Sequence, residues 1–362
     1  MQNEVFNFSA GPAMLPKEVM LQAQSEFIDW QGQGCSVMEM SHRSKPFIEL
    51  AQKATANLRA LLAVPDDYHV LFTHGGGRGQ FSAVPLNLSV KDDRADHLVT
   101  GSWSKGAVSE ANNYLNADVV ATTIEENGLI TLPSRDTWTM NSKAAYFHYC
   151  PNETVDGFEI DWVPQTEGVP VVADMSSTIL SRKIDVRQYG VIYAGAQKNI
   201  GPSGLSVVIV HDSLLNRARV ETPSILQYDL IAKNDSMYNT PPTFAWYLAG
   251  LVFEWLVAQG GVEAIEQRNQ QKAQLLYRAI DNNDFYANRI DPQYRSRMNV
   301  PFQLADPNLD SLFLQQAEHA GLKALKGHRI VGGMRASIYN AMPIEGVTAL
   351  VDFMNDFAKR NG

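Results

Sequence analysis

Short runs of apolar residues recur through the N-terminal two thirds of the chain, and small or polar residues follow each run. These runs lie at Tyr68–Phe72, His97–Val99, Asp118–Ala121, Ala145–Tyr149, Val169–Ala173, Val191–Ile192 and Leu205–Val210. An apolar run of this length between turn residues is typical of a strand that is buried on both faces. The pattern therefore predicts a sheet of short, buried strands.

Between and after these runs, apolar residues recur every three or four positions, which predicts amphipathic or buried helices. We expect helices over about 16–30, 46–61, 81 onwards, 104–113, 243–258, 262–282, 309–320 and 347–357. Residues 36–43 have no such period and are expected to be extended, and residues 222–245 are expected to be irregular before the helix. Strands that alternate with helices predict an α/β fold.

The pattern changes near residue 260. Beyond it, a long amphipathic helix leads to an alternating strand over 298–304, a helix, further strands and a final helix. This order is typical of a smaller α+β unit. We therefore expect a large domain over 16–260, and a small domain made of 1–15 and 261–362.

Polar or functional residues stand just after several of the predicted strands. They are Gly77, Arg78, Trp103, Thr154, Asp174 and Lys198. In open α/β sheets, ligands bind at the carboxyl ends of the strands. Their shared placement predicts a binding site at this edge.

The glycine-rich turn His74–Phe81 connects a predicted strand to a predicted helix. Glycines there let backbone N–H groups approach an anion, and the helix N-terminus favours negative charge. The turn matches neither the Gly-x-Gly-x-x-Gly nor the Gly-Lys-Ser/Thr motif. A flexible turn is the alternative, but Arg78 among the glycines favours a phosphate site.

Lys198 lies in the short link between two predicted buried strands, among small residues. Burial of an ammonium costs free energy, so such a lysine loses its proton easily and becomes a nucleophile towards carbonyls. The alternative for Lys198 is a solvated surface lysine. The alternative for Asp174 is a helix cap or a surface ion pair. Together with the glycine turn and Trp103, however, these two residues meet the needs of pyridoxal 5′-phosphate (PLP), which requires a phosphate site, a stacking surface, an anion and an amine.

Composition limits the other classes of function. The 362 residues carry a formal net charge of −9, which argues against nucleic acid or an anionic membrane as a partner. Two cysteines, Cys35 and Cys150, give no metal-ligand spacing and fit a reducing, cytoplasmic compartment. We expect no signal peptide, because Met1–Val5 has no basic segment before an apolar one.

Eight segments carry a resemblance to a known family. They are Phe6–Ala13, Ser41–Arg43, His74–Phe81, His148–Thr154, Ala173–Thr178, Ala194–Asn199, Asn239–Thr243 and Gly327–Arg329. In their order and spacing the chain resembles the phosphoserine aminotransferases, class V aminotransferases of PLP fold type I, essentially end to end. The resemblance implies a mainly parallel mixed sheet flanked by helices, plus a smaller C-terminal α+β domain.

The resemblance also implies roles for particular residues. Lys198 would bond to the cofactor aldehyde, and Asp174 would pair with the pyridinium nitrogen. The other cofactor contacts would be Gly77 and Arg78 with Gln197 at the phosphate, Trp103 stacked on the ring, Thr154 at its polar edge, and Asn239 and Thr240 from the partner subunit of a homodimer. The segments 123–143 and 162–169 differ from the family, and neither carries a role.

The expected reaction is ping-pong transamination between glutamate and phosphohydroxypyruvate, and the resemblance also allows a related step in vitamin B6 biosynthesis. These substrates carry two anionic groups, so Arg335 is expected to bind the α-carboxylate. The other anion would meet His42, Arg43, His328 and Arg329, although ordinary surface charge is the alternative for each pair. A cysteine desulfurase, an alanine–glyoxylate type aminotransferase and a non-catalytic cofactor-binding protein are the competing hypotheses.

Overall fold

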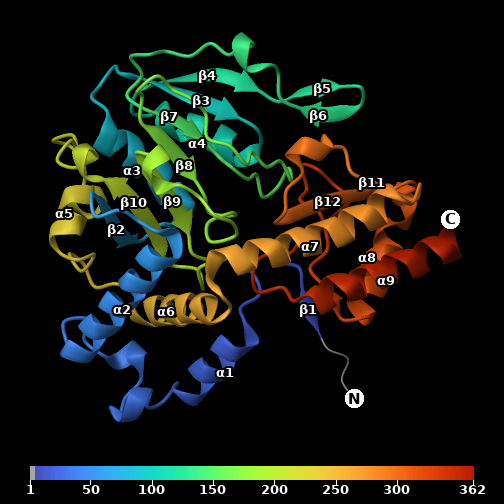
Figure 1. Ribbon diagram of the computed structural model, residues 1–362, viewed down its shortest axis with the longest axis horizontal. Coiled ribbons are helices and arrows are strands. Elements are labelled where there is room, and N and C mark those ends of the chain that lie inside the picture. Colours follow the sequence, from blue (N-terminus) through green and yellow to red (C-terminus); the bar gives the residue numbers. More distant parts are fainter. Residues whose placement is uncertain (1–4) are drawn as a thin grey trace.

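The computed structural model describes residues 5–362, and its larger part is built on one sheet (Figure 1). Within these residues the sheet has seven strands in the order β2-β10-β9-β8-β7-β3-β4. Their bounds are Tyr68–Thr73 (β2), Arg94–Val99 (β3), Asn116–Thr122 (β4), Phe147–Tyr149 (β7), Val171–Asp174 (β8), Val191–Gly195 (β9) and Ser206–His211 (β10). Strand β10 runs antiparallel to both neighbours, and the other pairs are parallel. The predicted mainly parallel mixed sheet is thus confirmed.

Helices cover both faces of this sheet. The helices α2 (Lys45–Leu62) and α6 (Thr243–Ala258) share one apolar cluster with one face of the sheet. On the other face lie α3 (Gly76–Leu88), α4 (Ser102–Ala111) and the short α5 (Tyr228–Lys233). Successive residues of a strand point to opposite faces, so Ile209 packs in the first cluster and Val208 in the second. This explains why the strands are continuously apolar.

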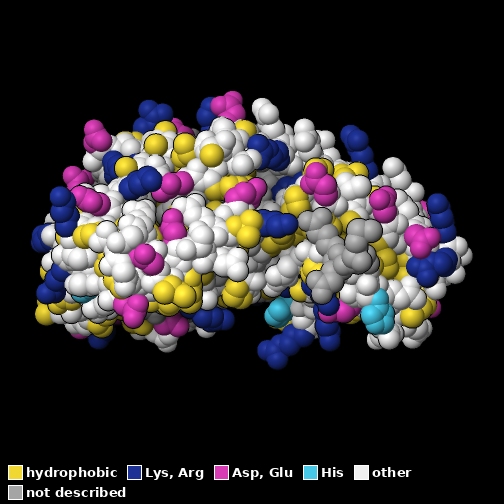
Figure 2. All heavy atoms as spheres, turned by 90° about the horizontal axis from the view of Figure 1, so that it is seen from below, with side chains coloured by type: hydrophobic (Ala, Val, Ile, Leu, Met, Phe, Trp, Pro, Cys, Tyr) yellow, Lys and Arg dark blue, Asp and Glu magenta, His cyan; other side chains and the backbone are white. Residues whose placement is uncertain are grey.

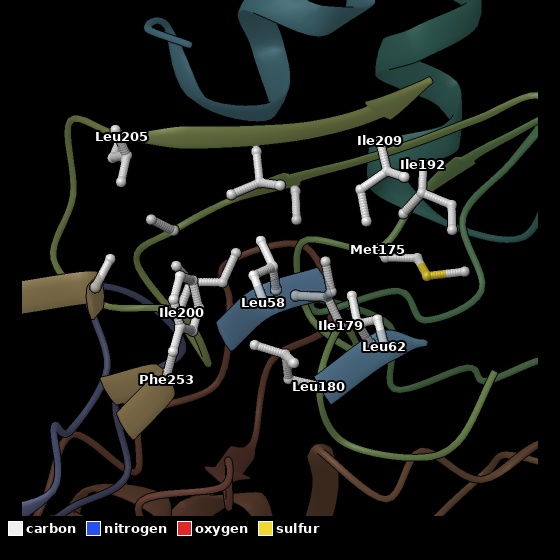
Figure 3. Close-up of a cluster of buried hydrophobic side chains, with 14 of the residues drawn as sticks. Leu58, Leu62, Met175, Ile179, Leu180, Ile192, Ile200, Leu205, Ile209 and Phe253 are labelled. Atoms are coloured by element: carbon white, nitrogen blue, oxygen red, sulfur yellow. The ribbon is translucent and has the colours of Figure 1, made fainter. Parts of the chain in front are cut away.

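The first cluster contains apolar residues that follow Asp174 and Lys198 closely in the chain. Figure 3 shows Met175, Ile179 and Leu180, which follow Asp174, together with Ile200, which follows Lys198, and Leu58 of α2. All five side chains are almost completely buried. Close packing of this kind leaves few alternative positions for the backbone. The residues that carry Asp174 and Lys198 are therefore held by the core.

A second apolar cluster organises the C-terminal part. It is formed by α7 (Gly261–Asp281), α8 (Asp310–His319), α9 (Ile344–Asn361) and the sheet β11-β12-β14, whose strands span Tyr286–Ala287, Asn299–Leu304 and Met334–Ser337. The strand β1 (Phe6–Asn7) pairs with β13 (Leu322–Lys323), and Phe6 and Phe8 belong to this cluster. Along α7, Val262 and Ile265 pack in the first cluster, whereas Leu276 and Ile280 pack in the second. The helix thus joins the two parts, as Figure 1 shows.

The remaining elements lie at the periphery. Helix α1 spans Lys17–Ser25, and the hairpin β5–β6, Ile124–Glu126 and Leu129–Thr131, projects from the sheet (Figure 1). Residues 1–4, on which the signal-peptide expectation largely depends, lie outside the described residues. Figure 2 shows the face around α1, with a notch between the two parts that is edged by histidine and Lys or Arg side chains.

Two local predictions are wrong. Residues 36–43, expected to be extended, contain the 3-10 turn Val37–Glu39, because Ser36 and Glu39 form a reciprocal cap on it. Residues 222–245, expected to be irregular before α6, contain α5, whose Tyr228 and Ile231 are buried against the sheet. Tertiary packing stabilises this six-residue helix, and so short a segment shows little helical period in sequence.

Membrane-spanning helices, metal-ligating groups and the cysteines can be examined across the described residues. No single helix in 5–362 has both the length and the apolar character to cross a membrane, although α6 and α7, bent by 82°, pass that test as a pair. No group of three or more metal-ligating side chains occurs in the same range. Cys150 is buried after β7, and Cys35 lies between two 3-10 turns; both thiols are free.

Candidate active site

The carboxyl ends of the parallel strands surround one pocket. Its lining residues come from the ends of β2, β3, β7, β8 and β9: Gly75, Gly76, Gly77, Arg78, Phe81, Trp103, Asn152, Thr154, Asp174, Ser176, Ser177, Gly195, Gln197 and Lys198. Seven residues that the sequence assigns to the cofactor are therefore brought together. They are Gly77, Arg78, Trp103, Thr154, Asp174, Gln197 and Lys198.

Lys198 is buried in the link between β9 and β10. Its Nζ donates a hydrogen bond of 2.5 Å to Thr154 Oγ1, and the residue as a whole is 6% exposed. Burial lowers the pKa of Lys198 to about 8, although the negative charges of Asp174 and Glu153 partly oppose this shift. At physiological pH the neutral amine is therefore far more abundant than in an ordinary lysine, although still the minor form, and the neutral amine is the nucleophile.

Asp174 ends β8 and faces the same pocket. Its Oδ1 accepts a 2.9 Å bond from the backbone N–H of Ser176, while Ser176 Oγ accepts one of 2.9 Å from the N–H of Gly195. Burial raises the pKa of Asp174, and its bonds with Ser176 and the charge of Lys198 oppose this. The environment therefore favours a cation beside the carboxylate, because a buried anion without one is costly.

The glycine turn is more helical than expected. Gly75 and Gly76 have φ of 88° and 62°, which other residues adopt only with strain, and α3 begins at Gly76. At Gly77 a Cβ would lie 3.2 Å from Ser176 Oγ and 3.5 Å from Asp174 Oδ2. The absence of side chains thus leaves the N–H groups at the start of a 13-residue helix open to the pocket.

Trp103 forms another wall of the pocket. It lies in the first turn of α4, and its ring centroid is 5.8 Å from Lys198 Nζ and 5.4 Å from Arg78 Cζ. The indole Nε1 is buried and has no hydrogen-bond partner among residues 5–362. A flat apolar ring with an unpaired donor beside an amine suits an aromatic ligand with polar substituents.

The residues assigned to the substrate are less closely gathered. Arg335, on β14, lies near enough to Lys198 for its charge to contribute to lowering the pKa of that lysine. Burial lowers the pKa of Arg335, whose Nε is buried without a partner in the described chain. None of His42, Arg43, His328, Arg329 and Arg335 is among the residues that line the pocket described above.

The histidines and arginines assigned to the substrate, and the two residues assigned to a partner's cofactor, differ in exposure. His42, in a turn, and His328, directly before one, are half-buried, and Arg43 and Arg329 are exposed. Asn239 and Thr240, assigned to a partner's cofactor, are exposed in the segment before α6 and do not line the pocket of their own chain.

The sequence analysis missed several residues around the pocket. Ser176 links Asp174 to Gly195, and Asn152 joins the end of β7 to Asn299 of the smaller part through a 2.9 Å bond. Glu153 binds the start of α4. Asn152 and Glu153 directly precede Thr154 in the segment after β7. Their position after a predicted strand is the sequence feature from which they could have been predicted.

Comparison with known proteins agrees with this geometry. The family model for class-V aminotransferases matches residues 5–350. A phosphoserine aminotransferase from Bacillus circulans subsp. alkalophilus is 44% identical, with 99% of both chains covered and a TM-score of 0.96. A PLP-bound phosphoserine aminotransferase from Trichomonas vaginalis is 42% identical, with 97% of this chain and 100% of that chain covered and a TM-score of 0.92.

More distant relatives share the fold alone. An alanine–glyoxylate aminotransferase from Nostoc sp. has 16% identity and a TM-score of 0.78, with 98% of this chain and 96% of that chain covered. The resemblance drawn from the sequence is confirmed by the matches above 40% identity over almost the whole chain. The chain belongs to the class-V aminotransferase family.

Proposed function

We propose that the chain is a phosphoserine aminotransferase, which transfers an amino group between glutamate and 3-phosphohydroxypyruvate with PLP as its cofactor. The observation that carries this proposal is the pocket in which Lys198, Asp174, Trp103 and the glycine turn meet at one sheet edge. Relatives with this activity in their names are 42–44% identical over nearly the whole chain. The products would be O-phosphoserine and 2-oxoglutarate, so the enzyme would serve serine biosynthesis.

The lining residues fit PLP. The unpaired indole Nε1 of Trp103 and the space that a Cβ at Gly77 would fill both favour a ligand with an aromatic ring and an anionic group. We assign Gly77, Arg78 and Gln197 to the phosphate, Trp103 to the ring face, and Thr154 to the polar edge. Asp174 would hold the ring nitrogen in its protonated form, because a cation there offsets the burial of the carboxylate.

Lys198 would both hold the cofactor and move protons. When bound, PLP supplies a conjugated ring that stabilises negative charge on the carbon beside the amino group. As a free amine, Nζ of Lys198 would take the proton from the substrate α-carbon as general base and would return a proton as general acid. A pKa of about 8 keeps both protonation states populated near neutral pH. The same steps in reverse, with the second keto acid, complete the ping-pong cycle.

Substrate choice would rest on the arginines and histidines. Arg335 would bind the α-carboxylate with both arms of its guanidinium, which fits its buried, unpaired Nε. His42, Arg43, His328 and Arg329 would meet the phosphate of one substrate or the γ-carboxylate of the other. The phosphorylated threonine analogue of vitamin B6 biosynthesis carries the same two anionic groups, so we include it as a second substrate.

We also propose a homodimer with shared active sites in the cytoplasm. Asn239 and Thr240 are exposed and away from their own pocket, as expected of residues that reach a partner's cofactor phosphate. Several apolar side chains around α1 are exposed as well: Met20, Leu21, Phe27, Ile28 and Met38. Exposed apolar residues gathered in one region are typical of a protein interface. The free thiols Cys35 and Cys150 fit a reducing compartment.

The two apolar clusters support the proposed division into domains. The large domain would comprise 16–260, and the small domain 1–15 with 261–362. Phe6 and Phe8 pack with α9 and β12 in the second cluster, which supports the assignment of the N-terminal arm to the small domain. Since α7 contributes to both clusters, it would carry any motion of one domain against the other.

A coupled assay tests the proposed function. The purified protein with PLP and glutamate is expected to convert phosphohydroxypyruvate far faster than pyruvate or glyoxylate. Preference for glyoxylate would favour the alanine–glyoxylate type, and release of sulfide from cysteine would favour a desulfurase. A protein that stays colourless after incubation with PLP would instead be a non-catalytic one, and the proposal would fail.

A further inference from the structure

The first turn of α4, which carries Trp103, rests on the segment that follows β7. Glu153 is completely buried there, and one of its oxygens, Oε2, accepts a 2.9 Å bond from the N–H of Trp103. The other oxygen, Oε1, accepts bonds of 2.8 Å and 2.6 Å from the N–H and the hydroxyl of Ser104. Asp156 Oδ2 accepts a fourth bond, of 2.8 Å, from the N–H of Ser102.

The contact between the two segments is tight. A Cβ at Gly101 would lie 2.4 Å from Asp156 Oδ2 and 2.7 Å from Glu153 Cδ, so only glycine lets the backbone come this close. The two carboxylates at the N-terminus of α4 also interact favourably with the helix dipole. An ordinary N-cap side chain belongs to the residue at the start of the helix itself. Here the capping carboxylates belong to residues about 50 positions further along the chain. The arrangement therefore fixes α4 against another strand end.

The same segment also holds Lys198. Thr154, the residue after Glu153, accepts the hydrogen bond from Lys198 Nζ. The backbone between Glu153 and Thr154 thus links the Trp103 ring to the amine. We propose that Glu153 is a positioning residue for the cofactor, which orients the stacking face of Trp103 relative to Lys198. This inference rests on the proposed function, because it takes PLP to be the ligand of the pocket.

The charge of Glu153 is costly, so its placement needs a reason. Burial raises the pKa of Glu153 to about 7, and Asp156 adds to this, while the bonds from Ser104 and Trp103 lower it. Cys150 and Lys198 also face this carboxylate closely enough to interact with its charge. A carboxylate can accept from Trp103 and Ser104 at the same time, whereas a protonated carboxyl has only one good acceptor. The ionised form therefore holds α4 more firmly.

Binding of pyridoxamine 5′-phosphate tests the inference, since this probe has no aldehyde and cannot bond to Lys198. Its affinity for the cofactor-free protein would be measured by calorimetry for wild type and for Glu153→Gln. In the variant one carboxylate oxygen becomes an NH2 group that faces a backbone N–H, so we expect an affinity about tenfold lower. The matched control is Glu159→Gln, because Glu159 is a buried carboxylate bound to Arg297 and away from the pocket. That control is expected to lower the melting temperature without a comparable change in affinity.

A double-mutant cycle separates positioning from general destabilisation. In a Trp103→Ala background, Glu153→Gln should have little further effect on probe affinity, because both changes remove the same stacking contact. Equal affinity of Glu153→Gln and wild type, or full additivity in the cycle, would overturn the inference. If Glu153→Gln does not fold, Ser104→Ala removes one of the three bonds to Glu153, and unchanged affinity in that variant would overturn it instead. Failure of the wild type itself to bind the probe would refute the proposed function rather than the role of Glu153.

Discussion

The cofactor side and the substrate side of the site are built differently. The seven residues assigned to PLP that line the pocket stand at or just after the ends of buried strands, or in the first turns of α3 and α4, and the packed core supports them. Of those assigned to the substrate anions, His42, Arg43 and Arg329 lie in turns, and His328 directly precedes one. A site on rigid elements keeps its geometry without a ligand, whereas loops adapt to one. We therefore expect the cofactor site to be prebuilt and the substrate site to be completed on binding.

The largest effect is expected from Lys198→Ala, which removes the amine at the centre of the prebuilt side. Turnover should fall by at least about 10⁴-fold, since the general base and the covalent attachment are both lost. The absorbance of lysine-bound PLP should disappear as well. Near-normal turnover in this variant would refute the assignment of the whole site.

Asp174→Asn tests the charge on the same side while it keeps the shape of the residue. Its carbonyl oxygen can still accept from the N–H of Ser176, so the pocket should remain folded. Loss of the negative charge should lower kcat by about 10²- to 10³-fold, because the protonated ring nitrogen loses its partner. Single-turnover rates measured with glutamate would check this. A rate equal to wild type would contradict the assigned role.

On the substrate side, Arg335 is expected to matter most, because it is the one that lies near Lys198 and on a strand. Arg335→Lys keeps the charge but loses the two-armed geometry, so KM for glutamate and for phosphohydroxypyruvate should both rise by about 30-fold. Steady-state kinetics with each substrate would measure the change. A rise for only one substrate would mean that Arg335 binds the distal anion rather than the α-carboxylate.

A cofactor site that buries Lys198 without a ligand should lower the free energy of unfolding of the protein. The pH dependence of that free energy can reveal the effect. The pKa of Lys198 is about 8 in the folded protein and about 10.4 in an unfolded chain. Between these values the unfolded chain binds more protons, so the free energy of unfolding of the cofactor-free protein rises with pH. The rise from pH 7.5 to 9.5 should be about 2 kcal/mol larger than in Lys198→Met. Urea unfolding at both pH values would test this, and equal slopes would argue against a buried, easily deprotonated lysine.

The two sides also differ in how well the sequence predicts them. Gly77, Asp174 and Lys198 follow apolar strands, so their shared edge could be inferred from the chain pattern, and the structure brings them into one pocket. The contacts from Glu153 to α4 and from Asn152 to Asn299 join segments about 50 and 147 residues apart. Such pairs depend on how the elements pack, which a local pattern does not contain. For the same reason the short helix α5 was not predicted.

The smallest effects are expected at the turns, and they would sharpen the comparison. His328→Ala and Arg329→Ala should each raise KM for phosphohydroxypyruvate by about fivefold, because partly exposed charges contribute little individually. The KM for glyoxylate, which has no second anion, should stay within twofold and serves as the control. If the loop that carries both residues adapts to the phosphate as a unit, the double variant should raise KM by less than the product of the single effects. Strict multiplication would instead show two independent contacts, and the substrate side would then be as rigid as the cofactor side.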